Sequence, residues 1–141
     1  MKTLMTAHAT SVGGRAGHVE SDDGIIAFDL AAVGSGKTGS NPEQLFAAGY
    51  SACFGSALDH VAKQAKIETG EIKVQADVSL NQDENGFSIG VTLHVTLPKL
   101  EVAEASKLVE QAHQICPYSK ATRNNVDVQF LVNQPPLSQV A

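Results

Sequence analysis

Residues 40–57 read SNPEQLFAAGYSACFGSA, and this stretch begins with the start signals of a helix. Asn41 is suited to the N-cap, Pro42 to the first helical position, and Gln44 lies three residues after the cap. Glu43 is an acid in the first turn, where the helix dipole stabilises negative charge. The sequence therefore predicts a helix that begins at this point.

The first half of the predicted helix is built almost entirely of small or apolar residues. We expect the helix to continue to about Ile67, where Thr69 and Gly70 stop it. A helix that is apolar all round belongs in a core, and small side chains allow neighbouring elements to approach closely. Two neighbouring stripes at helical spacing carry these small residues: Gly49, Cys53 and Ala57 on one, and Ala48, Ala52 and Ser56 on the other.

The rest of the chain predicts a single α+β domain over residues 1–141. Apolar residues alternate from Ile72 to Leu80 and from Ile89 to Leu97, which indicates a β-hairpin with one buried face. The element order lacks the repeating strand and helix alternation of a parallel α/β fold. The expected elements are short antiparallel strands over 6–32, the helix, hairpin strands over 71–80 and 87–97, an amphipathic helix over 102–115, a short turn over 117–122, a last strand over 126–132 and a Pro-rich tail.

The composition excludes several classes of protein. A net charge of −5 without clustered lysines argues against a nucleic-acid partner. No apolar run approaches the length of a membrane span, and the first residues lack the apolar stretch of a signal peptide, so we expect a cytoplasmic protein. Metal binding is not expected either, because the chain has no Cys-x-x-Cys and its five histidines show no ligand spacing.

Two cysteines, Cys53 and Cys116, are candidates for redox chemistry. In a reducing compartment a stable structural disulfide is uncommon, and redox or catalytic thiols are the usual exception. Cys53 lies in the middle of the predicted helix, where a cysteine is usually a small hydrophobe and burial raises its pKa. Its reactivity would need a cation from elsewhere. Cys116 precedes Pro117 and can occupy the N-cap of the following turn, where backbone N–H groups favour a thiolate. The alternative is a buried cysteine that ends the preceding helix.

Arg15 is the candidate cation, in a chain with one other arginine, Arg123. It lies in the glycine-rich turn 13–17, and its planar guanidinium could support a Cys53 thiolate and bind a substrate oxygen. Glu43 could be its carboxylate partner, because a buried arginine needs one. The alternatives are an exposed loop arginine and an acid that serves only the helix dipole.

The spacing of Glu43 and Cys53 favours a dimer. Ten residues of straight helix separate them by about 15 Å. If Arg15 meets both, its side chain spans the gap, the helix is interrupted, or one partner comes from a second chain. We expect a symmetric homodimer, because the small-residue stripes allow another helix to pack there.

These motifs together resemble the organic hydroperoxide resistance family of the OsmC-like superfamily, and the resemblance covers essentially the whole chain. The family usually has Arg-Gly-Asn at positions 123–125, where this chain has Arg-Asn-Asn. Asparagine also adopts a positive φ, so we expect a local change there. The stretches that carry the resemblance are Gly14–Gly17, Asn41–Phe54 and Cys116–Arg123.

The resemblance implies an OsmC-like α+β fold, with antiparallel sheets wrapped around long central helices in an intertwined cytoplasmic homodimer. It implies a thiol-dependent peroxidase in which Cys53 attacks the peroxide and Cys116 resolves the resulting sulfenic acid as a disulfide. Arg15 would activate the thiolate and Glu43 would hold the arginine. A dithiol, dihydrolipoamide or a lipoylated protein, would reduce the disulfide, without a metal or other cofactor.

Apolar residues near the cysteines would favour organic and fatty-acid hydroperoxides over hydrogen peroxide, because binding energy can be drawn from the alkyl chain. Two alternatives stay open: the sister OsmC-type peroxidase, and a non-catalytic ligand-binding domain with inert cysteines. The predicted substrate-binding residues are Leu45, Phe46, Phe54, Ile115 and Tyr118.

Overall fold

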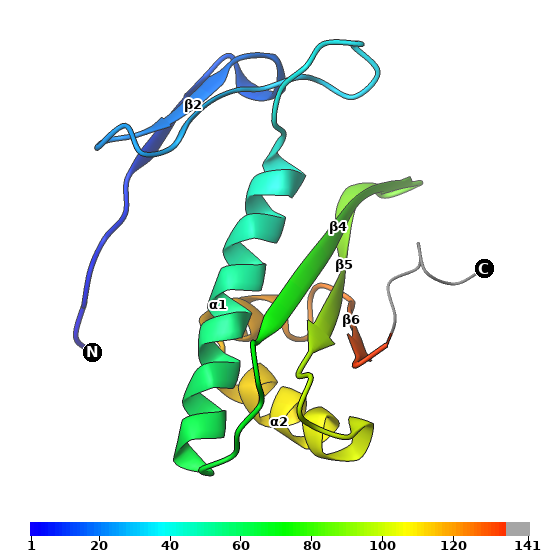
Figure 1. The fold of residues 1–141 in the computed structure, drawn as a ribbon. Coiled ribbons are helices and arrows are strands. Elements are labelled where there is room, and N and C mark those ends of the chain that lie inside the picture. Colours follow the sequence, from blue (N-terminus) through cyan, green and yellow to red (C-terminus); the bar gives the residue numbers. More distant parts are fainter. Residues whose placement is uncertain (135–141) are drawn as a thin grey trace. The chain divides into compact units, whose positions relative to one another are not determined.

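The computed structural model describes residues 1–134, and the chain forms two compact units, Met1–Leu45 and Phe46–Ala141. The prediction of one domain over 1–141 stays a prediction. The first unit contains a three-stranded antiparallel sheet in the order β1-β2-β3 (Figure 1), as the sequence predicts. Its strands are β1 (Ala9–Val12), β2 (His18–Ser21) and β3 (Ala27–Asp29).

Glycines determine the turn between β1 and β2. Gly13 and Gly14 have φ angles of 83° and 58°, in the left-handed region that favours glycine. A Cβ atom on Gly17 would lie 1.8 Å from the carbonyl oxygen of Val12, so no larger residue fits. The turn contains the 3₁₀ helix η1 (Gly14–Ala16), which carries Arg15.

Helix α1 (Pro42–Gln64) begins where the sequence predicts. The backbone N–H of Gln44 donates to Oδ1 of Asn41 at 2.7 Å, which is the predicted N-cap bond. The predicted end at about Ile67 is wrong by three residues. Lys66 adopts a φ of 56°, and its N–H and that of Ile67 bond back to the carbonyls of Lys63 and Ala62. This Schellman motif ends the helix without a glycine.

The second unit has a mixed sheet in the order β4-β5-β6, with β4 (Lys73–Asp83) antiparallel and β6 (Val128–Val132) parallel to β5 (Gly86–Thr96). The hairpin prediction is confirmed, although the strands extend further than expected and leave a two-residue turn at Glu84 and Asn85. The last strand begins two residues later than predicted. The Pro-rich tail lies outside the described residues.

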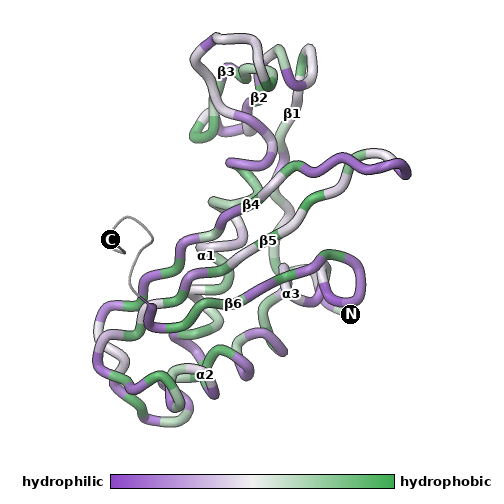
Figure 2. Tube along the Cα trace, turned by 90° about the vertical axis from the view of Figure 1, so that its right-hand side faces the viewer, coloured by the Kyte–Doolittle hydropathy of each residue, from purple (hydrophilic) through white to green (hydrophobic). Residues whose placement is uncertain are grey.

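The core of this unit lies between the sheet and its helices, α1, α2 (Val102–Ile115) and α3 (Pro117–Thr122). The buried residues of β5 belong to the same hydrophobic cluster as buried residues of α1 and α2, so both long helices cover one face of the sheet (Figure 1). Hydrophobic and hydrophilic residues alternate along the strands and α2 (Figure 2). The buried face is shorter than predicted, because Leu80 near the hairpin tip is exposed. The fully buried side chains are Tyr50, Phe54, Leu58, Leu93, Leu97, Val95, Cys116 and Ser119.

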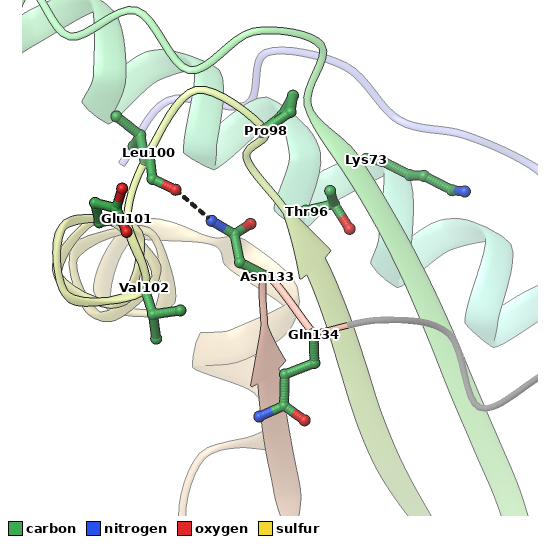
Figure 3. A pocket seen from close by; sticks show the side chains of 8 residues that line it. All are labelled: Lys73, Thr96, Pro98, Leu100, Glu101, Val102, Asn133 and Gln134. Carbon is green, nitrogen blue, oxygen red and sulfur yellow. Dashed lines mark hydrogen bonds between the residues drawn. The ribbon is translucent and has the colours of Figure 1, made fainter. Parts of the chain in front are cut away.

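Asn133 follows β6 and forms hydrogen bonds with residues that follow β5 (Figure 3). Its amide donates to the carbonyls of Leu97 and Leu100 at 3.1 and 2.8 Å and accepts the N–H of Leu97 at 2.7 Å. This bonding fixes the turn between β5 and α2. A hollow beside it contains none of the predicted site residues and is lined by Lys73, Thr96, Pro98, Leu100, Glu101, Val102, Asn133 and Gln134. Among residues 1–134, no helix is both long and apolar enough to cross a membrane.

Candidate active site

The structure brings the two cysteines together. Cys53 is half-buried on α1, and Cys116 is fully buried at the corner between α2 and α3. Their Sγ atoms lie 3.6 Å apart, and neither forms a disulfide. Two free thiols at this distance can exchange a hydrogen bond, and a small displacement would allow a covalent bond.

The corner at Cys116 is fixed by local backbone chemistry. Cys116 ends α2, its N–H donating to the carbonyl of Ala112 at 2.9 Å, and it is also the predicted N-cap of α3. The carbonyl of His113 would next accept the N–H of residue 117, but Pro117 has none. The guanidinium of Arg123 donates to that carbonyl instead. Arg123 thus ties the end of α3 to the end of α2 around Cys116.

The surroundings of Cys53 favour the neutral thiol. Burial raises the pKa of the Cys53 thiol, and the neighbouring Cys116 thiol raises it further. A hydrogen bond from the backbone N–H of Tyr118 lowers this pKa, but by less than burial raises it. A reactive thiolate at Cys53 therefore requires a positive group, as its position in the middle of the helix predicts.

Tyr118 packs on the face of α1 just before Cys53. Its ring makes an edge contact with Phe46 at a centroid distance of 6.0 Å and a tilted contact with Tyr50 at 5.7 Å. Gly49 leaves the space for this ring, because an added Cβ there would lie 2.6 Å from Oη of Tyr118. The small-residue stripe predicted from the sequence thus seats an aromatic ring within the same chain.

We expect Gly49→Ala to destabilise the protein by about 1 kcal/mol, because overpacking costs about 1–3 kcal/mol and better helix propensity offsets about 1. In a Tyr118→Ala background the same change should stabilise by about 1 kcal/mol, since the clash is gone. Urea unfolding at fixed protein concentration measures both values. Equal effects in the two backgrounds would contradict the assigned contact.

Arg15 and Glu43 form the predicted ion pair within the first unit. The two guanidinium nitrogens donate to the two carboxylate oxygens at 2.8 and 2.6 Å, a bidentate arrangement. The Glu43 side chain is 12% exposed and that of Arg15 is 44% exposed. The bonds from Arg15 lower the pKa of Glu43. The carboxylate therefore stays charged and holds the guanidinium in one orientation.

The predicted substrate-binding residues differ in exposure. Ile115 and Tyr118 are exposed and Phe46 is half-buried, so each has surface that a ligand could contact. Phe54 has no exposed surface and packs in the core against Phe130 at a centroid distance of 5.5 Å. Leu45 is half-buried at the end of the first unit. Contact of any of them with a substrate stays a prediction.

Sequence reasoning missed a buried group of hydroxyls beside the thiol pair. Tyr50, Ser119 and Thr122 are buried and bonded to one another. The sequence indicates these hydroxyls only weakly. Tyr50 is the one large residue among the small residues just before Cys53, and Ser119 and Thr122 lie one turn apart after Cys116. Within residues 1–134, no group of three or more His, Cys, Asp or Glu side chains could hold a metal ion.

The architecture agrees with what comparisons with known proteins show. The family model of OsmC-like proteins matches residues 34–130. The chain is 56% identical to the organic hydroperoxide resistance protein OhrB of Bacillus subtilis, covering 90% of this chain and 96% of that protein. It is 47% identical to the organic hydroperoxide resistance protein of Xanthomonas axonopodis pv. citri, covering 90% and 93%.

Solved structures give the same result. The crystal structure of Bacillus subtilis OhrB matches with a TM-score of 0.87 at 53% identity, over 92% of this chain and 99% of that one. The Legionella pneumophila organic hydroperoxide resistance protein matches with a TM-score of 0.88 at 47% identity, over 94% and 100%. The chain therefore belongs to the organic hydroperoxide resistance family of OsmC-like proteins.

Proposed function

We propose that the protein is a cysteine-based peroxidase that reduces organic hydroperoxides to alcohols. The observation that carries this proposal is the pair of free thiols, Cys53 and Cys116, whose sulfurs lie 3.6 Å apart. The names of its relatives support the choice of organic hydroperoxides as substrate. An inert pair of cysteines would not need two thiols from distant segments to meet.

In the proposed reaction the Cys53 thiolate attacks the distal peroxide oxygen. The O–O bond breaks, the alkoxide takes a proton to leave as the alcohol, and Cys53 becomes a sulfenic acid. The sulfur of Cys116 then attacks that of Cys53, which forms the disulfide and releases water. An external dithiol reduces the disulfide by exchange and becomes a disulfide itself. The net reaction converts one hydroperoxide and one dithiol into an alcohol, water and a disulfide.

The ion pair of Arg15 and Glu43 supplies the positive group in this proposal. Burial raises the pKa of Cys53, so a nearby guanidinium would restore the thiolate. Glu43 holds the guanidinium by two hydrogen bonds, which leaves its remaining N–H groups for the sulfur and a peroxide oxygen. We propose that the working form is a cytoplasmic homodimer with two active sites at the subunit interface.

The apolar surface near the thiols suits an alkyl chain. Phe46, Ile115 and Tyr118 have accessible surface, and their burial by a ligand would contribute about 25 cal/mol per Å². This supports organic and fatty-acid hydroperoxides as substrates. We propose dihydrolipoamide or a lipoylated protein as the reductant, with no metal or other cofactor.

One equivalent of cumene hydroperoxide should reduce the mass of the chain by two hydrogens, because the disulfide forms within it. Dihydrolipoamide should restore the original mass, as intact-protein mass spectrometry would show. In Cys116→Ser the same treatment should instead add one oxygen at Cys53, trappable with dimedone. A wild-type mass that does not change would favour the non-catalytic ligand-binding alternative.

A further inference from the structure

A buried cluster of three hydroxyls connects the two helices that carry the thiols. The hydroxyl of Tyr50 on α1 shares hydrogen bonds with Oγ of Ser119 at 2.9 Å and Oγ1 of Thr122 at 3.2 Å, both on α3. Tyr50 and Ser119 are 0% exposed and Thr122 is 3% exposed. Thr122 also donates to the carbonyl of Ser119 at 3.2 Å. The three hydroxyls bond within the protein and are almost completely excluded from solvent.

Such a cluster contributes little net stability to a core. A buried hydroxyl loses its water and regains little more than that loss from its new hydrogen bonds. Phenylalanine at position 50 would fill nearly the same volume among its aromatic neighbours, Phe46 and Phe54. What hydroxyls add is direction, since they are satisfied only when α3 lies in one register on α1. The cluster therefore specifies geometry more than it adds stability.

The cluster lies beside the two thiols, so the register of α3 on α1 also affects where the sulfurs lie. Tyr50 precedes Cys53 by three residues, so both lie on the same face of α1, about 4.5 Å apart along the axis. Ser119 follows Cys116 by three residues, which is also one turn. Each end of the hydroxyl bond therefore lies one turn from a sulfur, and the bond fixes the helix positions beside the pair.

We propose that Tyr50 is a positioning residue for disulfide closure, acting through Ser119 and Thr122 on the separation of the two sulfurs. This inference rests on the proposed peroxidase function. The sulfurs lie 3.6 Å apart and a disulfide is about 2.05 Å long, so closure needs an approach of roughly 1.5 Å. A helix pair held in register keeps the sulfenic sulfur and Cys116 near attack distance. A misplacement of about 1 Å can slow such a step about 100-fold.

The test is Tyr50→Phe followed in single turnover with cumene hydroperoxide. Oxidation of Cys53 to the sulfenic acid should change by less than about threefold, because attack on peroxide does not use Cys116. Closure of the disulfide should slow by about 10- to 100-fold. The sulfenic acid should then accumulate as a dimedone adduct that the wild type does not show. This split between two steps is a result that a general loss of stability would not produce.

Matched variants separate the possible results. Thr69→Val removes another buried hydroxyl, which donates to the carbonyl of Gly70, and should leave both steps unchanged. Ser119→Ala should slow closure as Tyr50→Phe does, and the double variant should be no slower than the slower single variant. If Tyr50→Phe does not fold, the rate of disulfide closure in Ser119→Ala tests the proposal.

Three results would count against the proposal, and each has a different meaning. If folded Tyr50→Phe and Ser119→Ala close their disulfides at the wild-type rate, the positioning role is wrong and the peroxidase proposal stands. If the wild type itself forms no disulfide with peroxide, the proposed function and this inference fail together. Slower closure in Thr69→Val as well would also overturn the role of the cluster.

Discussion

Replacing Cys53 by serine should reduce turnover of cumene hydroperoxide by at least about 1,000-fold, because an alcohol cannot replace the thiolate nucleophile. The serine hydroxyl is nearly isosteric with the thiol and titrates far above the pH at which a cysteine forms a thiolate. The half-buried position on α1 should tolerate the change, so the fold should persist. Consumption of hydroperoxide with dihydrolipoamide as the reductant measures the loss.

Cys116→Ser is the matched control for this prediction. It should lose steady-state turnover with the dithiol but retain one rapid round of peroxide reduction per subunit, because Cys53 still attacks. Cys53→Ser should lose that first round as well. Retention of full turnover in Cys53→Ser would end the assignment, and a first round that fails only in Cys116→Ser would reverse the two roles.

Arg15→Ala should slow the oxidation of Cys53 at pH 7 by about 10- to 100-fold, because the proposed guanidinium no longer stabilises the thiolate. Burial already raises the pKa of Cys53, and loss of the proposed guanidinium should raise it further. Below its pKa the thiolate fraction falls about tenfold per pH unit. The midpoint of alkylation by iodoacetamide should therefore move to higher pH, and the rate at neutral pH should fall accordingly.

Two conservative variants separate charge from orientation at this site. Arg15→Lys keeps the positive charge but loses the two-pronged bond to Glu43, so it should restore the alkylation midpoint only in part. Glu43→Gln keeps the guanidinium and removes the charge that orients it, so its effect should be smaller than that of Arg15→Ala. An alkylation profile in Arg15→Ala that matches the wild type would remove Arg15 from the mechanism.

The sequence predicted the helix ends that are determined by caps and prolines within one turn. Asn41 and Pro42 marked the start of α1 because a cap bond and a fixed φ act within one turn. The limits of α2 and the N-cap position of Cys116 followed from the apolar period and from Pro117. The pairing of Arg15 with Glu43 was predicted because a buried arginine needs a carboxylate partner and because the family resemblance implies it, and the structure shows the pair.

The remaining features depend on contacts that local patterns do not contain. The end of α1 was placed too late because Lys66 takes a left-handed conformation normally associated with glycine. The bond between Tyr50 and Ser119 joins residues 69 positions apart, and neither residue type signals a buried partner. The meeting of Cys53 and Cys116 was expected from the family resemblance, because periodicity gives no distance between distant segments.

The proline after Cys116 limits how the site can move during the proposed catalytic cycle. A residue before proline is disfavoured in the helical region, and Cys116 has φ −63° and ψ 122° accordingly. The bend between α2 and α3 therefore cannot straighten into one continuous helix when the two sulfurs bond or separate. We expect rotation about the side-chain torsions of the two cysteines to bring the sulfurs together. The pair would then pass between its dithiol and disulfide states while the backbone keeps its fold.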